Sequence, residues 1–349
     1  MRKTKFAPIA PLFETDSYKV DHIRQYPEGT EVVYSNFTNR GSRIEGVNHV
    51  VAFGLQAFIK KYIEDAFIPF FAADEDEVCE LYAERVATAI GGNKDEVGTD
   101  HIRALHRKGY LPLHFRAVKE GTLVPLRVPT FTVENTEPEF FWLTNYIETV
   151  LSASVWYPST SATKAVMVRS LIEKWAAETG GAEAFIDWQW HDFSFRGQTT
   201  PESAAASGAA HLLTFTGTDN LNSFEWIDSY YPGDNGFVGG SVFATEHSVM
   251  CAGTAHENEL ETYRRLLTIY PTGIVSVVSD TYDLWSVLTN ILPTLKDDIM
   301  GRDGKLVIRP DSGDPADILC GGYEVAADWQ QDWEEIQAGK PDTRTPAQK

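Results

Sequence analysis

Three short polar clusters between residues 191 and 248 carry side chains that could do chemistry. They are residues 191–197 (HDFSFRG), 217–219 (GTD) and 245–248 (TEHS). Each cluster combines a titratable side chain with a glycine or another small residue, as expected where strands run out into the active-site loops of an α/β barrel. One such cluster alone is more often a cap or a turn, so the prediction of a site depends on the set.

Two later segments repeat one plan, a β-branched run that ends in an acid. They are residues 273–280 (GIVSVVSD) and 305–315 (KLVIRPDSGDP). Continuous apolar runs of this length are typical of strands buried on both faces, as in parallel sheets. Asp280 and Asp311 are therefore predicted to lie at the carboxyl ends of strands, which is the edge where barrels and doubly wound folds place their chemistry.

A helix is predicted over 201–213, directly after the first cluster. Thr200 is a suitable N-cap and Pro201 suits the first helical position. The amino end of this helix could then offer free N–H groups and the positive end of its dipole to an anion held by Arg196.

The first half of the chain has mixed patterns. Helical periodicity is expected over 52–67, 74–89, 139–154 and 161–178, and alternating strands over 111–116 and 122–133. Gly180 and Gly181 form a natural helix end and the expected domain boundary. We therefore predict an α/β protein: a mixed α+β domain over 1–180, an incomplete, irregular β/α barrel over 181–320, and a loop-like truncated end over 321–349.

Charge and composition limit the classes of function. Thirty basic against fifty acidic residues give a net charge of −20, which disfavours nucleic acid and anionic membranes as partners. No window approaches the ~18 apolar residues of a membrane span. Three widely spaced cysteines form no disulfide or zinc pattern, so we expect a cytoplasmic protein: Cys79, Cys251 and Cys320.

Several motifs in order resemble the nicotinamide phosphoribosyltransferase family, among the type II phosphoribosyltransferases: residues 15–20 (TDSYKV), 25–27 (QYP) and 309–313 (RPDSG). The resemblance implies transfer of phosphoribose from 5-phosphoribosyl 1-pyrophosphate to nicotinamide, giving nicotinamide mononucleotide and pyrophosphate. It also implies Mg²⁺ on the phosphates, ATP hydrolysis coupled through a phosphorylated histidine, and a homodimer.

The resemblance assigns a nicotinamide site. Phe193 would stack on one face of the pyridine ring, and Tyr18 of a second subunit on the other. Asp219 would accept the carboxamide NH₂ and repel a carboxylate, which favours the amide over the acid. Arg309 would lie near the base and the phosphates.

It also assigns the phosphate and catalytic residues. Arg196 would bind phosphate, and Arg40 would reach across the dimer. His247 would be phosphorylated, Asp280 would orient it, and Asp311 would lie close to the ribose and magnesium. Three further residues complete the expected site: Asp16, Ser276 and Glu246.

The sequence also departs from the family. Ser194 and Phe195 replace an expected glycine and tyrosine. The family continues beyond the RPDSG motif with ribose-phosphate elements, so we expect this chain to correspond to roughly the first two thirds of the enzyme, to need a complementing C-terminal fragment, and to be inactive alone. Two alternatives stay open: a nicotinate or quinolinate phosphoribosyltransferase, and an inactive fragment that only binds ligand or a partner subunit.

Overall fold

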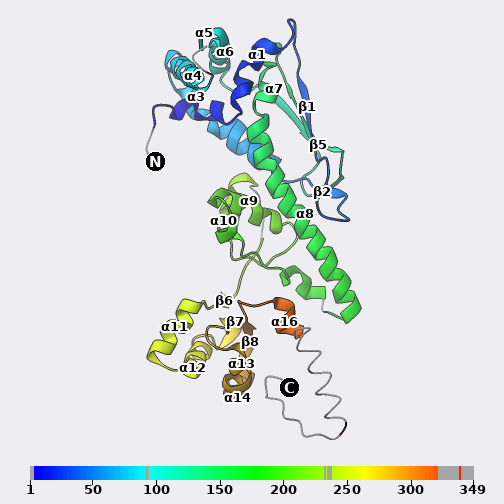
Figure 1. The fold of residues 1–349 in the computed structure, drawn as a ribbon, viewed down its shortest axis with the longest axis vertical. Coiled ribbons are helices and arrows are strands. Elements are labelled where there is room, and N and C mark those ends of the chain that lie inside the picture. Colours follow the sequence, from blue (N-terminus) through cyan, green and yellow to red (C-terminus); the bar gives the residue numbers. More distant parts are fainter. Residues whose placement is uncertain are drawn as a thin grey trace. The chain divides into compact units, whose positions relative to one another are not determined.

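The structure is a computed structural model that describes residues 4–90, 94–181, 183–231, 233, 238–320 and 338. It forms two compact units, Met1–Gly240 and Ser241–Lys349. Each is considered by itself, and Figure 1 labels the elements of both.

The first unit contains two small antiparallel sheets. One has the order β1 (Tyr34–Thr38), β5 (Pro129–Asn135), β3 (Leu113–Ala117), and the other pairs β2 (His49–Val51) with β4 (Leu123–Pro125). The rings of Phe37 and Phe131 stack across β1 and β5 with centroids 4.9 Å apart. The predicted strands over 111–116 and 122–133 are confirmed as antiparallel, but the second segment is divided into β4 and β5, and β1 and β2 were not predicted.

Short helices pack with this sheet around the first hydrophobic core. The side chain of Asp74 caps the start of α4 by accepting the N–H groups of Asp76 and Glu77, and Gly109 ends α6 in a left-handed conformation. These helices are η1 (Ala7–Phe13), η2 (Ser17–Asp21), α1 (His22–Gln25), α2 (Leu55–Phe58), the π-helix η3 (Ile59–Ala66), α3 (Ile68–Ala72), α4 (Glu75–Ala89), α5 (Lys94–Val97) and α6 (Asp100–Lys108).

The long helix α8 (Glu148–Thr179) is the axis of the first unit (Figure 1). It follows η4 (Pro138–Phe140) and α7 (Leu143–Tyr146). The prediction of two separate helices over 139–154 and 161–178 was wrong, because the single helix α8 continues through Pro158. An added Cβ on Gly54 would lie 2.8 Å from Pro158, so a glycine lets the preceding loop pack against this part of the helix. Gly180 ends α8 with a φ of 70°, as predicted.

Beyond α8, α9 (Pro201–His211) packs against α8 and against α10 (Asn222–Tyr230). Small residues of α9 such as Ala205 and Ala209 share a buried cluster with Ala162 of α8. This packing ties the residues after 180 to the first compact unit, which ends at Gly240. The expected domain boundary at residue 180 stays a prediction. Two short helices, η5 (Glu183–Trp188) and η6 (Phe195–Gly197), precede α9.

The second unit is built on a parallel sheet in the order β6 (Phe243–Ala244), β7 (Thr272–Val278), β8 (Asp303–Arg309). The two predicted β-branched strands are therefore confirmed as parallel neighbours, with Val275, Val277 and Val278 fully buried. Its helices are α11 (His247–His256), α12 (Glu259–Ile269), α13 (Leu284–Ser286), the π-helix η7 (Val287–Ile291), α14 (Leu292–Thr294), α15 (Lys296–Gly301) and α16 (Pro315–Cys320).

The α/β class is confirmed, and parallel bridges also join Asp192 to Thr218 and Gly217 to Gly240 in the first unit. That the strands of both units belong to one barrel stays a prediction. The expected loop-like end, 321–349, lies outside the described residues except for position 338. Within the described part of the chain, no helix is long and apolar enough to span a membrane.

Candidate functional site

Asp192 organises the polar clusters of the first unit. It is buried, its Oδ1 accepts the N–H of Ser194 at 2.9 Å, and its Oδ2 lies 3.3 Å from the Nδ2 of Asn220. The backbone carbonyl of Asp192 accepts a hydrogen bond from the N–H of Asp219, and the N–H of Asp192 donates to the carbonyl of Gly217, each at 3.0 Å. The predicted clusters at 191–197 and 217–219 are thus adjacent, held by a buried carboxylate.

Two glycines permit this close packing. A Cβ on Gly208 of α9 would lie 1.9 Å from Ser223 Oγ and 2.9 Å from Asp192 Oδ2, and a Cβ on Gly217 would lie 2.6 Å from His191 Nδ1. Neither glycine has a positive φ. Both are therefore required for space at the polar cluster.

Phe193 projects from this cluster and is 57% exposed. Its ring lies against His191, with centroids 4.8 Å apart, and the Nε2 of His191 lies 3.3 Å from Asp219 Oδ2. A cavity of about 390 Å³ adjoins Phe193, with walls from the middle of α8 and from α9: Tyr157, Thr160, Ser161, Lys164, Trp190, His191, Asp192, Phe193, Ser194, Gln198, Ser207 and His211. An exposed ring, an imidazole and a carboxylate thus meet beside a ligand-sized cavity.

Arg196 lies in η6 with its side chain exposed and forms no ion pair with a described residue. The expected N-cap at Thr200 is confirmed, and it forms a capping box with Ser203. The expectation of free N–H groups at this helix end is met only in part. Pro201 has none, and the N–H of Ser203 donates to Thr200 Oγ1 at 3.1 Å.

Tyr18 lies elsewhere in the first unit, in η2, and is 60% exposed. Its neighbour Lys19 donates to Glu148 and so fixes η2 at the first turn of α8, whereas Phe193 faces residues 157–164. At a rise of 1.5 Å per residue these places are on the order of 15 Å apart along the helix, too far for both rings of one chain to hold the same base.

Two other expected residues also lie in the first unit. Asp16 accepts a hydrogen bond from Thr149 Oγ1 at 2.6 Å, which fixes the amino-terminal segment to α8. Arg40 is exposed in the loop after β1. The described chain therefore gives Asp16 a structural contact and leaves Arg40 open to solvent.

Thr245 connects the strands of the second unit where they end. Its N–H donates to the Ser276 carbonyl at 2.9 Å, its Oγ1 accepts the N–H of Val278 at 3.0 Å, and its carbonyl accepts Arg309 Nη2 at 2.8 Å. The Nε atom of Arg309 is buried without a hydrogen-bond partner among the described residues. The guanidinium group of Arg309 is thus bound to Thr245 through its Nη2 atom. Ser276 is buried in β7 and contributes its backbone.

His247 begins α11 and lies among the strand ends, as expected. Its Nδ1 is 3.0 Å from Thr281 Oγ1, and its Nε2 is 3.3 Å from Asp311 Oδ2 and 4.0 Å from Asp280 Oδ1. The imidazole is half exposed. Glu246, the N-cap of α11, accepts a hydrogen bond from Ser248. The structure therefore joins His247, Asp280 and Asp311, as the sequence predicted.

Asp280 is the buried member of this group, 8% exposed against 56% for Asp311. Its Oδ2 accepts the Asp311 N–H at 2.9 Å and the Ser312 hydroxyl at 2.5 Å. Burial raises the pKa of Asp280, but these two bonds and nearby His247 outweigh burial and keep the pKa below its ordinary value. Asp280 is therefore ionised at neutral pH.

The carboxylates at the strand ends offer oxygen ligands of the kind that a hard cation such as Mg²⁺ prefers. No group of three or more His, Cys, Asp or Glu side chains in the described residues forms a complete metal site. Asp280 Oδ1 is nevertheless buried with no hydrogen-bond partner there, and the Asp311 carboxylate is exposed. Mg²⁺ prefers such hard oxygens and takes most of its other ligands from water and substrate phosphates.

Three contributors were missed from the sequence: Thr281, Ser312 and Asn220. Thr281 directly follows Asp280, and Ser312 lies within the RPDSG motif at residues 309–313. Their positions beside predicted site residues could have identified them, although their residue types could not. His211, expected to be a buried histidine, is one: its Nε2 lies 2.9 Å from the Gly217 carbonyl, and burial lowers its pKa.

Two phosphoribosyltransferase family models match parts of this chain. Residues 188–338 match the nicotinate phosphoribosyltransferase (NAPRTase) family, and residues 10–114 match the nicotinamide phosphoribosyltransferase N-terminal domain. A solved structure of human nicotinic acid phosphoribosyltransferase shares the fold, with a TM-score of 0.59 and 16% identity over 93% of this chain and 66% of that one.

The curated relatives that match this chain are nicotinamide phosphoribosyltransferases. The chain is 48% identical to the nicotinamide phosphoribosyltransferase of Acinetobacter baylyi over 92% of its own length and 65% of that protein. It is 35% identical to that of Mycoplasma pneumoniae, covering 92% of this chain and 71% of the relative. The chain belongs to the nicotinamide phosphoribosyltransferase family. It spans about two thirds of the length of the curated relatives it matches.

Proposed function

We propose that this chain carries most of the site that transfers phosphoribose from 5-phosphoribosyl 1-pyrophosphate to nicotinamide, in salvage toward NAD. In this reaction the bond from ribose C1′ to the pyrophosphate oxygen breaks and a bond from C1′ to the pyridine nitrogen forms. The observation that carries the proposal is Asp219 beside the ring pair of His191 and Phe193, next to a cavity.

The nicotinamide end follows from these groups. The exposed face of Phe193 takes the pyridine ring by offset stacking, and Asp219 accepts the carboxamide NH₂. A nicotinate carboxylate at the same place would meet the charge of Asp219, which supports the amide as substrate. The Nε2 atom of His191 lies 3.3 Å from this carboxylate but has no hydrogen-bond partner among the described residues. Because Tyr18 of the same chain is too far away, the second ring comes from a partner, so the proposal includes a homodimer.

The phosphate end uses Arg196, Arg309 and the acids at the strand ends. Guanidinium groups bind phosphate in a bidentate manner. The side chain of Arg196 is exposed, and that of Arg309 is fixed at the strand ends by its bond to the Thr245 carbonyl. Magnesium, when bound, neutralises phosphate charge as the pyrophosphate leaves. Asp311 and Asp280 are the residues that would hold it. Positive charge develops on the ribose in such a transfer, and the side chains of Asp280 and Asp311 stabilise it.

His247 is the proposed acceptor of a phosphoryl group from ATP. Its Nε2 is the nitrogen on the side of the two acids, and its Nδ1 lies 3.0 Å from the Thr281 hydroxyl. In this step the bond between the terminal phosphorus and the ADP oxygen breaks and an N–P bond forms, with ATP as the co-substrate. A cytoplasmic location is part of the proposal, supported by free cysteines at 79, 251 and 320.

The test is a turnover assay in two formats, with nicotinamide, 5-phosphoribosyl 1-pyrophosphate, Mg²⁺ and ATP. One uses the purified chain alone. The other adds, as a separate polypeptide, the part of the Acinetobacter relative that this chain does not cover. Nicotinamide mononucleotide should form in the complemented format. Conversion of nicotinate in place of nicotinamide would contradict the proposal and favour the nicotinate enzyme.

A second candidate is a chain that binds nicotinamide or a partner subunit without turnover. This candidate is favoured because Phe193 and Asp219, the residues proposed to contact nicotinamide, both lie within residues 1–240, which form a compact unit. Nicotinamide binding with no product in either assay format would support it. Binding and turnover measured on the same preparation therefore separate the two functions.

A further inference from the structure

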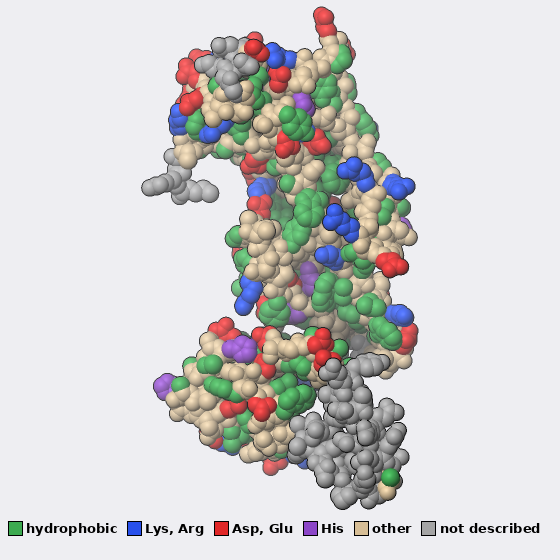
Figure 2. Space-filling model, in the orientation of Figure 1, with side chains coloured by type: hydrophobic (Ala, Val, Ile, Leu, Met, Phe, Trp, Pro, Cys, Tyr) green, Lys and Arg blue, Asp and Glu red, His purple; other side chains and the backbone are tan. Residues whose placement is uncertain are grey.

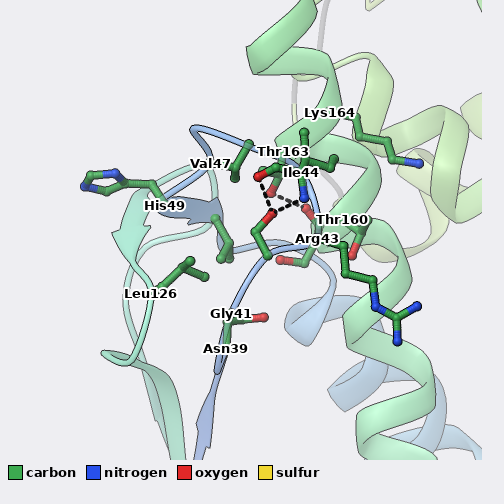
Figure 3. Close-up of a pocket in the computed structure, with 13 residues that line it drawn as sticks. Asn39, Gly41, Arg43, Ile44, Val47, His49, Leu126, Thr160, Thr163 and Lys164 are labelled. Atoms are coloured by element: carbon green, nitrogen blue, oxygen red, sulfur yellow. Dashed lines mark hydrogen bonds between the residues drawn. The ribbon is translucent and has the colours of Figure 1, made fainter.

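A second cavity lies in the first unit, beneath the loop that joins β1 to β2 (Figure 3). Its volume is about 390 Å³, which is within the range of small-molecule sites. The loop contributes Asn39, Gly41, Ser42, Arg43, Ile44 and Val47, and β2 contributes His49 and Val50. Leu126 and the α8 residues Ser159, Thr160, Thr163 and Lys164 complete the lining.

The walls of this cavity are fixed by the backbone. The loop is held at one end by the N–H of Arg127 donating to the Asn39 carbonyl at 2.8 Å, and at the other by the N–H of Leu126 donating to the Asn48 carbonyl at 2.9 Å. The N–H of Val51 donates to Thr163 Oγ1 at 3.0 Å and so ties β2 to α8. The cavity therefore exists before any ligand arrives.

The lining is divided by chemistry. Figure 3 shows Arg43 and Lys164 on the side of α8, with Val47, His49 and Leu126 on the other side. Figure 2 shows Lys and Arg side chains gathered where β2 lies beside α8. A ligand that matches this division carries an anionic group at one end of an apolar or heterocyclic body.

Arg43 and Lys164 are exposed, and neither forms an ion pair with a described residue. Nine other described basic side chains of the first unit do pair with carboxylates: Lys5, Lys19, Arg24, Lys61, Arg103, Arg107, Lys108, Arg169 and Lys174. An anion in the cavity that both side chains line would be attracted to each of them.

We propose that this cavity binds a small phosphomonoester, with Arg43 and Lys164 as the residues that hold the phosphate. The guanidinium supplies a planar fork for two phosphate oxygens and the ammonium adds a point charge, a combination better suited to phosphate than to a single carboxylate. Ile44, Val47 and Leu126 contact the body of the ligand.

The site is connected to the cavity beside Phe193, because Thr160 and Lys164 line both. When a phosphate binds Lys164 in the cavity beneath the β1–β2 loop, the ammonium group of Lys164 is no longer available to the cavity beside Phe193. Occupation of one cavity therefore changes affinity in the other. This coupling rests on the proposed nicotinamide site, whereas phosphate binding does not.

Binding is measured by calorimetry on the full chain, with inorganic phosphate, adenosine monophosphate and benzoate as probes. Adenosine monophosphate should bind saturably, and the double variant Arg43→Gln with Lys164→Met should lose at least tenfold in affinity. The matched control is Arg116→Gln with Lys119→Met, two exposed basic residues of the same unit that do not line the cavity. Equal affinity in the wild type and the first variant would overturn the proposal, as would tighter binding of benzoate than of the phosphate probes.

Two further arms secure the assignment. In the wild-type chain, bound adenosine monophosphate should protect Lys164, and not Lys119, from acetylation read by mass spectrometry, which needs no variant to fold. Binding that Arg196→Gln abolishes and the Arg43 and Lys164 variant keeps would place the ligand at the catalytic phosphates and overturn the proposal. Nicotinamide titrations with and without adenosine monophosphate should differ at least threefold, and Lys164→Met should remove the difference. Failure of nicotinamide to bind at all would count against the proposed function alone.

Discussion

The Nδ1 atom of His247 lies 3.0 Å from the Oγ1 atom of Thr281, on the side of the imidazole opposite its two carboxylate neighbours. A hydroxyl can accept from Nδ1–H, and this leaves the lone pair on Nε2. Thr281 thus positions the nitrogen that the proposed phosphoryl transfer uses, in addition to the role expected for Asp280.

Thr281→Val should reduce phosphorylation of His247 by about five- to tenfold, because one hydrogen bond contributes ~1 kcal/mol. The measurement is the rate of acid-labile labelling from γ-labelled ATP in the complemented enzyme. Thr281→Ser keeps the hydroxyl and is the matched control. His247→Ala should lose the label and keep a slow, uncoupled transfer. Equal labelling rates in the valine and serine variants would remove Thr281 from the mechanism.

The strand ends were predictable because the signal is local. A β-branched run ending in an acid places Asp280 and Asp311 after β7 and β8 whatever the rest of the fold does. The start of α9 was predictable for the same reason, since Thr200 and Pro201 set it by their own chemistry. Local sequence thus located most of the residues around His247.

Other features depend on contacts between distant segments. The continuity of α8 through Pro158 depends on packing against Gly54, and the division after Gly240 depends on α9 lying against α8. The role of Thr245 in joining the strand ends could not be predicted, because it depends on the pairing of β6 with β7. The unpaired state of Arg43 and Lys164 also has no local pattern, because it requires knowing where the carboxylates lie.

Asp219→Asn should weaken discrimination against nicotinate. The substitution removes a charge that repels the acid and introduces an amide that can donate as well as accept. We expect the ratio of kcat/KM for nicotinamide over nicotinate to fall at least tenfold in competition assays. Asp228→Asn, on the exposed face of α10, is the control. An unchanged preference would mean that Asp219 does not face the base.

Gly208→Ala should destabilise the first unit by about 1–3 kcal/mol, the usual cost of overpacking. The new methyl group would meet Ser223 Oγ at 1.9 Å and Asn220 Nδ2 at 2.6 Å, both in the buried cluster around Asp192. Urea unfolding followed by tryptophan fluorescence measures the change. Gly41→Ala adds a methyl group with no atom within 4 Å and is the control. Equal midpoints for the two variants would contradict the packing around Asp192.

His101 should make stability depend on pH. Burial lowers its pKa from 6.5 to about 4, only partly opposed by Asp100. Its ring packs edge-on against Trp142, with centroids 5.0 Å apart. Between pH 6.5 and about 4 the unfolded chain binds a proton that the folded chain does not, so stability falls as pH falls through this window. The loss attributable to His101 is at most about 3 kcal/mol.

The comparison that isolates His101 is the change in the free energy of unfolding between pH 7 and pH 4.5, measured with urea. His101→Gln cannot take up the proton, so the variant should lose less stability over this range than the wild type, even if it begins less stable at pH 7 because packing against Trp142 is lost. His114→Gln, at an exposed histidine on β3, should follow the wild type. If the wild type and His101→Gln lost the same amount, another group would have to bind the proton on unfolding, and the depressed pKa of His101 would not be the cause.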